Sequence, residues 1–309
     1  MQLIEPEVQL IEQKPGIDGI YEIIDRIAGI CYGREGTHDD SKKFVDGLIN
    51  RGHMSPLEFG TVYLYLESNE SNSLNSVESN NMEMAWLDIV YRVYTKYKDN
   101  QFSRAISIND TCKHSVYITT NYRVIIENHW EDDLQYLSEP RQNHAKQYCF
   151  NLICSRGIAD EFARHRTLSV MMKSTRYCKF DSMEITKPMW VKNEFPNITK
   201  ECIETILEGN DEPVDVPLKL YLWWYHMYVA QYTYKSMITL GAKPQEARGV
   251  LPLDMATNLC LCGVYGTPNK GWNRFFDLRC DNAAHPDAIY LAKQMRDIVN
   301  NKENHYKDE

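Results

Sequence analysis

The chain has 309 residues, of which 43% are hydrophobic, 25% charged and 11% aromatic. These values are typical of a folded globular protein, and they exclude a largely disordered or collagen-like chain. With 34 Lys and Arg against 43 Asp and Glu, the net charge is -9, which argues against a general nucleic-acid binder, so we expect no nucleic-acid partner.

The cysteines and the first residues of the chain bear on its cellular location. The nine cysteines include no C-x-x-C pair, which disfavours a disulfide-bonded secreted scaffold. The first residues are acidic where a signal peptide needs basic ones, and no apolar run is long enough to span a bilayer. The sequence therefore predicts a cytoplasmic protein without a membrane partner.

The first 66 residues predict two helices and a strand. Isoleucines at helical spacing predict a helix over residues 17–32, which Gly33 ends, and a second helix is expected over residues 39–50. Gly52 and Pro56 then break the helix, and residues 61–66 alternate between apolar and polar as a strand does.

The middle of the chain predicts an insertion in a single domain. Residues 67–81 are almost entirely Ser, Asn and Glu, which predicts a solvated surface loop. The segment 82–139 is expected to be mostly helical, around residues 86–97 and 122–130, and residues 147–154 to form a strand. No domain boundary is evident, so we predict one α+β domain over residues 1–309, with a mainly antiparallel sheet and an inserted helical and loop segment at about 67–145.

The remaining elements are mainly helical. A helix is expected to begin within residues 158–163, and a strand or loop containing Pro188 and Pro196 follows. The apolar stretch 216–240 predicts a long helix with aromatic side chains on all sides, which suits burial by several partners, a subunit interface or the core of one subunit. A turn at 241–248 precedes two helices around residues 269–278 and 286–299.

Residues 164–179 predict an anion site. This segment contains five cations and no acid, in a chain that is acidic as a whole: Arg164, Arg166, Lys173, Arg176 and Lys179. Arginine binds phosphate oxygens in bidentate geometry, and Ser169, Ser174 and Thr175 add neutral donors, so a nucleotide phosphate would fit. The alternative is a solvated basic helix face, which is a common outcome for runs of charge.

The spacing within this segment resembles the signature of the flavin-dependent thymidylate synthases. R-H-R is followed by seven residues, a Ser and then T-R-Y. Three further motifs occur in the family's order: H-M-S-P-L-E at residues 53–58, A-R-G-V-L-P at 247–252, and N-K-G-W-N-R-F-F-D-L-R at 269–279. Together they cover most of the chain from about 17 to 299, apart from the insertion.

The resemblance implies two sets of ligand-binding residues and one catalytic residue. For FAD it implies His53, Ser55, Glu58, Arg164, His165, Arg166, Asn269 and Lys270. For dUMP it implies Glu161, Arg164, Ser174, Thr175, Arg176, Arg248 and Arg279. Arg279 is also the expected catalytic residue, since a cation at the uracil can stabilise negative charge developing on the ring. The competing interpretation makes Arg248 and Arg279 ordinary helix C-terminal cations and His53 a turn residue.

The sequence departs from the family pattern at several positions. Met171 and Met172 replace Asn and Glu, Ala283 replaces His, and the family's Asn and Arg near the start of its last element are matched only loosely by residues 268–270. Glu161 stands where the family usually has Gln, so this carboxylate either turns away from a nucleotide phosphate, pairs with an arginine, or binds a sugar hydroxyl.

The activity implied by the resemblance is methylation of dUMP to dTMP. Methylenetetrahydrofolate would donate the one-carbon unit, and FAD reduced by NADPH would supply the hydride, so no catalytic cysteine is needed. None of the nine cysteines follows a Pro, as the nucleophile of the flavin-free enzymes does, and Cys178 is expected to be a packing residue. The scattered histidines and the single C-x-C predict no metal.

The resemblance also implies a homotetramer whose active sites combine residues of several subunits. Two alternatives to the main prediction stay open. One is an enzyme of the same fold that transfers another one-carbon group, for example a hydroxymethyl group, to a pyrimidine nucleotide. The other is a nucleotide-binding protein without catalytic activity.

Overall fold

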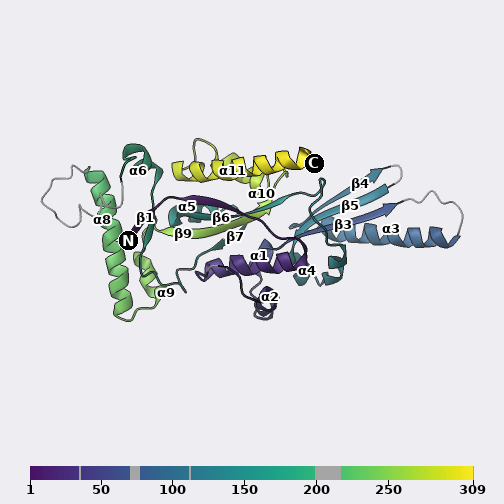
Figure 1. The fold of residues 1–309 in the computed structure, drawn as a ribbon, viewed down its shortest axis with the longest axis horizontal. Helices are drawn as coiled ribbons and strands as arrows, with labels where there is room; N and C mark the ends of the chain where they lie inside the picture. Colours follow the sequence, from purple (N-terminus) through teal and green to yellow (C-terminus); the bar gives the residue numbers. More distant parts are fainter. Residues whose placement is uncertain (35, 70–76, 111–112, 199–216, 309) are drawn as a thin grey trace.

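A four-stranded antiparallel sheet lies at the centre of the molecule, as the computed structural model shows (Figure 1). The structure describes residues 1–34, 36–69, 77–110, 113–198 and 217–308. The strand order is β2 (Glu7–Ile11), β6 (Gln147–Ser155), β9 (Ala256–Val264) and β7 (Ser169–Met172).

The two middle strands are buried on both faces. Cys149, Cys260 and Cys262 point into the core on one side, while Phe150 and Leu261 point into the core on the other. Successive side chains of a strand point to opposite faces, so a strand with helices on both sides is expected to be apolar almost throughout. The sequences of β6 and β9 follow this pattern.

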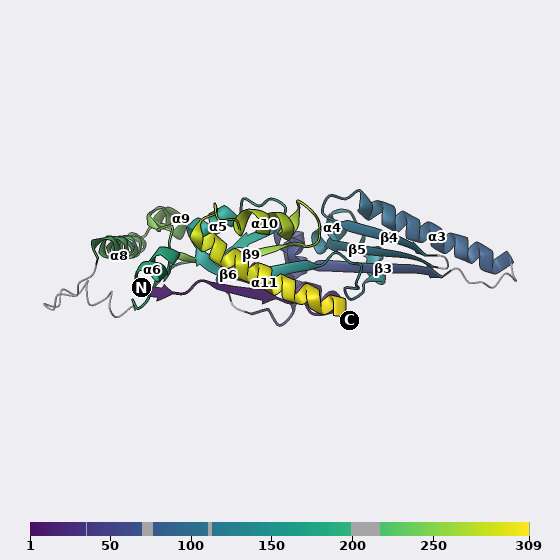
Figure 2. The same cartoon turned by 90° about the horizontal axis from the view of Figure 1, so that it is seen from above.

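Helices cover both faces of this sheet: they lie above and below it in Figure 1, and Figure 2 shows the upper layer lying across the strands. One face packs against α1 (Gly16–Cys31), which is followed by α2 (Ser41–Asn50) and the short 3-10 helix η1 (Ser55–Phe59). The other face packs against α5 (Arg156–Phe162), α10 (Gly271–Arg279) and α11 (Pro286–Asp308).

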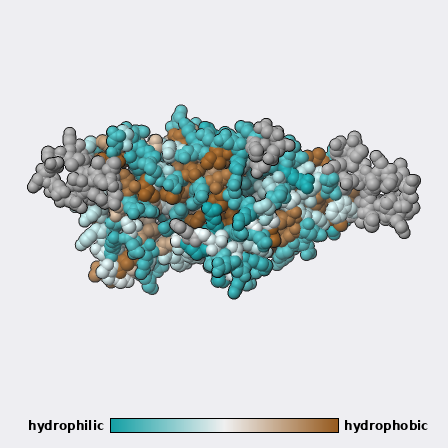
Figure 3. All heavy atoms as spheres, in the orientation of Figure 1, coloured by the Kyte–Doolittle hydropathy of each residue, from teal (hydrophilic) through white to brown (hydrophobic). Residues whose placement is uncertain are grey.

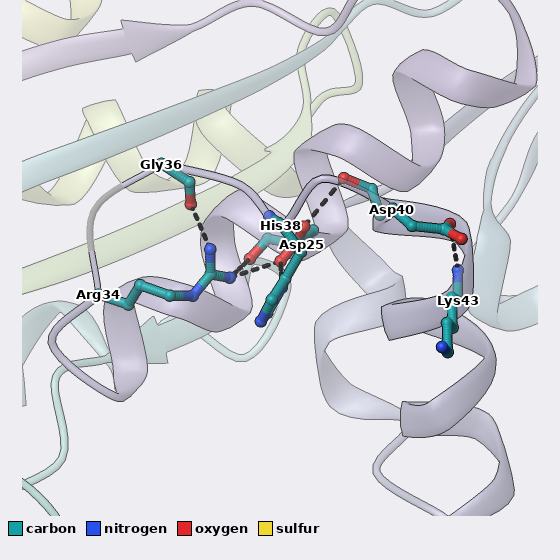
Figure 4. Close-up of polar contacts among 7 residues, drawn as sticks. Asp25, Arg34, Gly36, His38, Asp40 and Lys43 are labelled. Atoms are coloured by element: carbon teal, nitrogen blue, oxygen red, sulfur yellow. Dashed lines mark hydrogen bonds and ion pairs between the residues drawn. The ribbon is translucent and has the colours of Figure 1, made fainter.

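Asp25 fixes the connection between α1 and α2. This carboxylate is completely buried, and it accepts hydrogen bonds from Arg34 at 2.5 Å, from the backbone and ring nitrogens of His38 at 2.7 and 2.8 Å, and from Ser41 at 2.9 Å. Figure 4 shows Arg34 and His38 pointing toward Asp25 from the connecting loop. Burial alone would raise the pKa of Asp25, but the hydrogen bonds from His38, Ser41 and Arg34 outweigh it and lower the pKa. The network therefore sets where α2 and the following turn lie.

A second antiparallel sheet extends from one end of the molecule (Figure 1). Its strands lie in the order β3 (Thr61–Asn69), β5 (Lys113–Asn121), β4 (Arg104–Asp110). Its inner face, with Leu64 and Ile118, packs against Val93 and Tyr97 of α3 (Val77–Lys98). Helix α4 (Tyr122–Glu127) and the 3-10 helix η2 (Glu131–Tyr136) lead back to the central sheet.

The opposite end is built around a long helix, α8 (Leu218–Thr239). A two-stranded parallel sheet, β1 (Gln2–Ile4) and β8 (Glu184–Thr186), lies beside it. Trp224 and Tyr234 of α8 pack on Ile185 of β8 and on Met183, which directly precedes that strand. The short helices there are α6 (Met189–Glu194), α9 (Pro244–Ala247) and the 3-10 helix η3 (Arg248–Val250).

The predicted fold class is confirmed, since the chain combines helices with mainly antiparallel sheets. The helices expected over residues 17–32, 39–50 and 216–240 and the strands expected over 61–66 and 147–154 are present. Among the described residues, no helix has the length and apolar character needed to cross a membrane.

Two predictions about the middle of the chain were wrong. Residues 67–69 continue β3 and residues 77–81 begin α3, rather than forming a loop, and residues 70–76 lie outside the described part. The helices expected around residues 86–97 and 122–130 are present as α3 and α4, but the segment 82–139, expected to be mostly helical, also contains strands β4 and β5. In β4 the apolar Ile106 and Ile108 alternate with the polar Ser107 and Asn109, as in other strands, although both isoleucines are exposed.

Candidate functional site

The motif R-H-R follows directly after α5, where a tight turn separates its side chains. The backbone N–H of His165 donates to Phe162 O at 3.1 Å, and that of Leu168 donates to His165 O at 3.0 Å. As a result His165 is buried, with 8% of its surface exposed, while Arg164 and Arg166 point outward. The two arginines of the motif are thus exposed to solvent, whereas the histidine between them is buried.

Arg279 joins this turn from the last turn of α10. Its Nε donates to His165 Nε2 at 2.8 Å, one terminal nitrogen donates to the Glu161 carboxylate at 2.8 Å, and the other donates to the Glu161 carbonyl at 2.9 Å. The guanidinium also lies 5.8 Å from the centre of the Phe162 ring. Three hydrogen bonds hold the guanidinium in one orientation, and 18% of its side chain is exposed.

Burial and nearby cations keep His165 neutral. Burial, together with the positive charges of Arg279 and Arg274, lowers the pKa of His165 to about 4. A neutral ring can accept the bond from Arg279 at Nε2, which leaves the proton on Nδ1. Of the three possibilities for Glu161, the structure shows the pairing with an arginine.

The start of α10 depends on a glycine. Gly271 has a φ of +50°, and a Cβ at this position would lie 2.1 Å from the carbonyl oxygen of Val264. Only glycine fits such a close approach to the backbone. Lys270 and Asn269, with φ of 58° at Asn269, form the turn just before it. This turn places Lys270 at one end of α10, while Arg279 lies at the other.

A cationic cavity of about 270 Å³ opens between the two sheets. We use this name for the space lined by Glu58, Arg104, Arg166, Ser169 and Lys270. Glu58 comes from η1, Arg166 and Ser169 from the R-H-R turn and β7, and Lys270 from the turn before α10. Three of the residues expected at FAD, from three separate motifs, therefore line one cavity.

A tyrosine cavity of about 350 Å³ lies beside the end of α1. It is lined by Tyr32, His53, Ser55, Ser174 and Tyr177, together with Met171 and residues of the surrounding helices. The exposed rings of Tyr32 and Tyr177 are 5.9 Å apart at an angle of 46°. The backbone N–H of Ser174 donates to Cys31 O at 2.9 Å, which holds the signature segment against α1.

The remaining predicted site residues line neither cavity. Thr175 is buried, Arg164, Arg176, Arg248 and Asn269 are exposed, and Glu161, His165 and Arg279 form the cluster around the guanidinium. Cys178 is buried and its thiol contacts Cys31 O at 3.6 Å, as expected of a packing residue. The sequence analysis did not single out Arg104 or Tyr32 as site residues, and no motif marks either of them.

One cation-rich segment, residues 164–179, borders both cavities: it contributes Arg166 and Ser169 to the cationic cavity and Ser174 and Tyr177 to the tyrosine cavity. The chain belongs to the Thy1 family, described as thymidylate synthase complementing protein, whose model matches residues 141–302, just over half of the chain. This confirms the resemblance drawn from the signature. A comparison with curated proteins found no match to the chain.

Among solved structures, one similar chain is thymidylate synthase X (ThyX) from Helicobacter pylori, crystallised with FAD and dUMP. It is 20% identical, with a TM-score of 0.33, and the match covers 49% of this chain and 66% of the Helicobacter pylori chain. The chain thus spans slightly less than two thirds of that protein.

Proposed function

We propose that this protein is a flavin-dependent thymidylate synthase, which methylates dUMP to dTMP. In this proposal methylenetetrahydrofolate donates the one-carbon unit and NADPH reduces the bound FAD. The observation that carries it is the meeting of Glu58, Arg166 and Lys270 in one cavity of a chain that belongs to the Thy1 family. Glu58 and Lys270, the first and last of these residues, are more than two hundred positions apart in the sequence.

The lining of the cationic cavity fits FAD. Among the described residues, Arg166 and Lys270 have no carboxylate partner, so their charges remain available to the diphosphate. Glu58 offers carboxylate oxygens to sugar or ribityl hydroxyls, and it is held by Arg123 at 2.7 Å. The proposed flavin set also includes His165 and Arg164 from the same turn and Asn269 beside Lys270. His53 and Ser55, which line the tyrosine cavity, belong to it as well. When bound and reduced, FAD supplies the hydride.

The tyrosine cavity is lined by further residues of the proposed flavin and dUMP sets. His53 and Ser55 reach it from the turn after α2, and Ser174 reaches it from the signature segment. We assign Ser174, Thr175, Arg176, Arg164 and Arg248 to dUMP, whose phosphate needs local positive charge in a chain with a net charge of -9.

Arg279 is the proposed catalytic residue. The carboxylate of Glu161 faces the guanidinium rather than remaining unpaired, which removes the repulsion that a free carboxylate would exert on a nucleotide phosphate. The hydrogen bond from Nε to the neutral ring of His165 fixes the plane of the guanidinium. A cation that is already oriented stabilises charge on the uracil ring without further reorganisation.

We also propose that α8 forms a subunit interface in a homotetramer. Exposed apolar side chains follow one face of this helix at alternating spacings of four and three residues: Leu218, Leu222, Tyr225, Val229 and Tyr232. The opposite face is buried in this chain through Trp224 and Tyr234. Such a stripe is typical of a helix that packs against a partner helix. Figure 3 shows separate apolar patches over the middle of the drawn face, away from α8, which lies toward the left in this orientation.

The test is the visible spectrum of the purified protein with added FAD, followed by anaerobic NADPH with and without dUMP. Flavin bands that bleach with NADPH, and a product with the mass of dTMP when folate is supplied, would support the proposal. Arg166→Ala should weaken flavin binding, while the exposed Arg92→Ala serves as a matched control. A protein that binds no flavin, or a product heavier by one oxygen, would refute it.

A further inference from the structure

The cationic cavity has a wall that comes from outside the region matched by the family model. Gln101, Phe102, Ser103 and Arg104 all line it; the first three lie in the turn before β4, and Arg104 is the first residue of that strand in the second sheet. The family match begins at residue 141. The second sheet therefore contributes side chains to a cavity whose other cations belong to the matched region.

Arg104 is held toward the cavity by two hydrogen bonds. Its Nε donates to Thr267 Oγ1 at 3.3 Å, in the turn that leads to Lys270, and Nη1 donates to the carbonyl of Ser103 at 3.1 Å. Because a guanidinium carries five N–H donors, three of them remain available to a ligand. The residue is only half-buried, so these donors are accessible.

The charge of the cavity is not balanced by the protein. Arg104, Arg166 and Lys270 have no carboxylate partner within the described part of the chain. The acid that lines the cavity, Glu58, is already paired with Arg123 at 2.7 Å. Three unpaired cations around a space of about 270 Å³ attract a ligand with more than one negative charge.

We propose that Arg104 is a third phosphate-binding cation, which binds the diphosphate of FAD together with Arg166 and Lys270. This inference rests on the proposed function for the identity of the ligand. The second sheet is then part of the cofactor site. Phe102, which is 64% exposed at the same wall, presents an aromatic face on which the adenine of a dinucleotide can stack.

A solvated surface arginine would show different features. Arg92 on α3 is such a residue, since it is exposed and lines neither cavity. Arg104 instead shares its cavity with two cations, and like charges brought together without a counter-charge repel one another. That arrangement is unfavourable for the free protein, and binding of an anion relieves it.

The test measures the affinity of the full-length protein for FAD by flavin fluorescence and for ADP by calorimetry. The variants are Arg104→Gln, which keeps a donor for Thr267 but removes the charge, and Arg104→Lys, which keeps the charge. Arg92→Ala is the matched control, and circular dichroism verifies that each variant is folded. We expect Arg104→Gln to raise the Kd for FAD about tenfold or more, Arg104→Lys to raise it less, and Arg92→Ala to leave it unchanged.

The outcomes separate this inference from the proposed function. If the wild-type protein binds FAD and Arg104→Gln binds it equally well, Arg104 is not part of the site, although the flavin assignment stands. If the wild-type protein binds ADP but not FAD, and Arg104→Gln weakens ADP binding, the phosphate site stands and the flavin assignment falls. Binding of neither compound overturns both.

Discussion

Acidification should destabilise the protein through His165. In the native state the neutral ring accepts a hydrogen bond from Arg279 Nε at 2.8 Å. A protonated ring carries N–H groups at both nitrogens, so it cannot accept this bond, and it would place a positive charge against the guanidinium. The perturbation is therefore a fall in pH, and the matched variant is His165→Gln, whose amide oxygen can accept from Arg279 at any pH.

The size of the effect follows from the two pKa values. Burial, with the charges of Arg279 and Arg274, lowers the pKa of His165 from 6.5 to about 4 in the folded protein. Between these values the unfolded chain binds more protons than the folded one, so stability falls as the pH drops through that window and is constant below it. At about 1.4 kcal/mol per pKa unit, the loss has an upper limit of about 3 kcal/mol.

The assay is urea unfolding of wild type and His165→Gln at several pH values between about 7 and about 5. His144→Gln is the comparison, because burial also lowers the pKa of His144 to about 4 and that residue titrates in the same window. In each variant, the decrease in the free energy of unfolding between about pH 7 and about pH 5 should be smaller than in the wild type by about 1 kcal/mol or more. A pH dependence that is identical in wild type and His165→Gln would refute the reasoning about His165.

Three further substitutions test other parts of the structure. Asp25→Asn removes the charge of a fully buried carboxylate that accepts four hydrogen bonds, so urea unfolding at neutral pH should show a loss of about 2 to 4 kcal/mol, whereas the exposed Asp39→Asn should cause little change. Arg248→Ala should weaken dUMP binding by about 1.5 to 3 kcal/mol in calorimetry while leaving FAD bound, and unchanged dUMP affinity would remove this residue from the site. Glu161→Gln removes the negative charge 2.8 Å from Arg279, so it should tighten dUMP binding by about 0.5 to 1 kcal/mol, and weaker binding would show that the carboxylate assists the ligand.

The elements that could be predicted from the sequence are those with a clear hydrophobic period. The isoleucines of α1 recur at helical spacing and are buried, so periodicity alone located that helix. Strand β9 was not predicted, because its residues are apolar in succession and a strand buried on both faces has no alternation. Strand β4 was missed because its alternation of apolar and polar residues, from Ile106 to Asn109, is only four residues long.

The site residues that could be predicted from the sequence are those that lie within a motif. Residues within one motif keep a fixed spacing, so Arg166 and Ser174 could be named from the sequence. The cavity lining contributed by Arg104 could not be predicted, because it depends on how the second sheet packs against the turn at Thr267, more than 160 residues further along the chain. The partner of Glu161 likewise depends on where α10 ends, and the sequence left three possibilities open.

The path of the chain through the second sheet suggests how such a structure could arise in evolution. The chain departs and returns at neighbouring points, since the backbone N–H of Ser138 donates to Tyr63 O at 2.9 Å and Leu64 bridges to Leu137. A segment whose ends meet can be acquired by a gene without rerouting the rest of the protein. The ring of Tyr122, within this segment, packs edge-on against Tyr21 of α1 at 5.7 Å, so removal of the segment would expose that part of the helix to water. Such a segment is easy to gain and costly to lose.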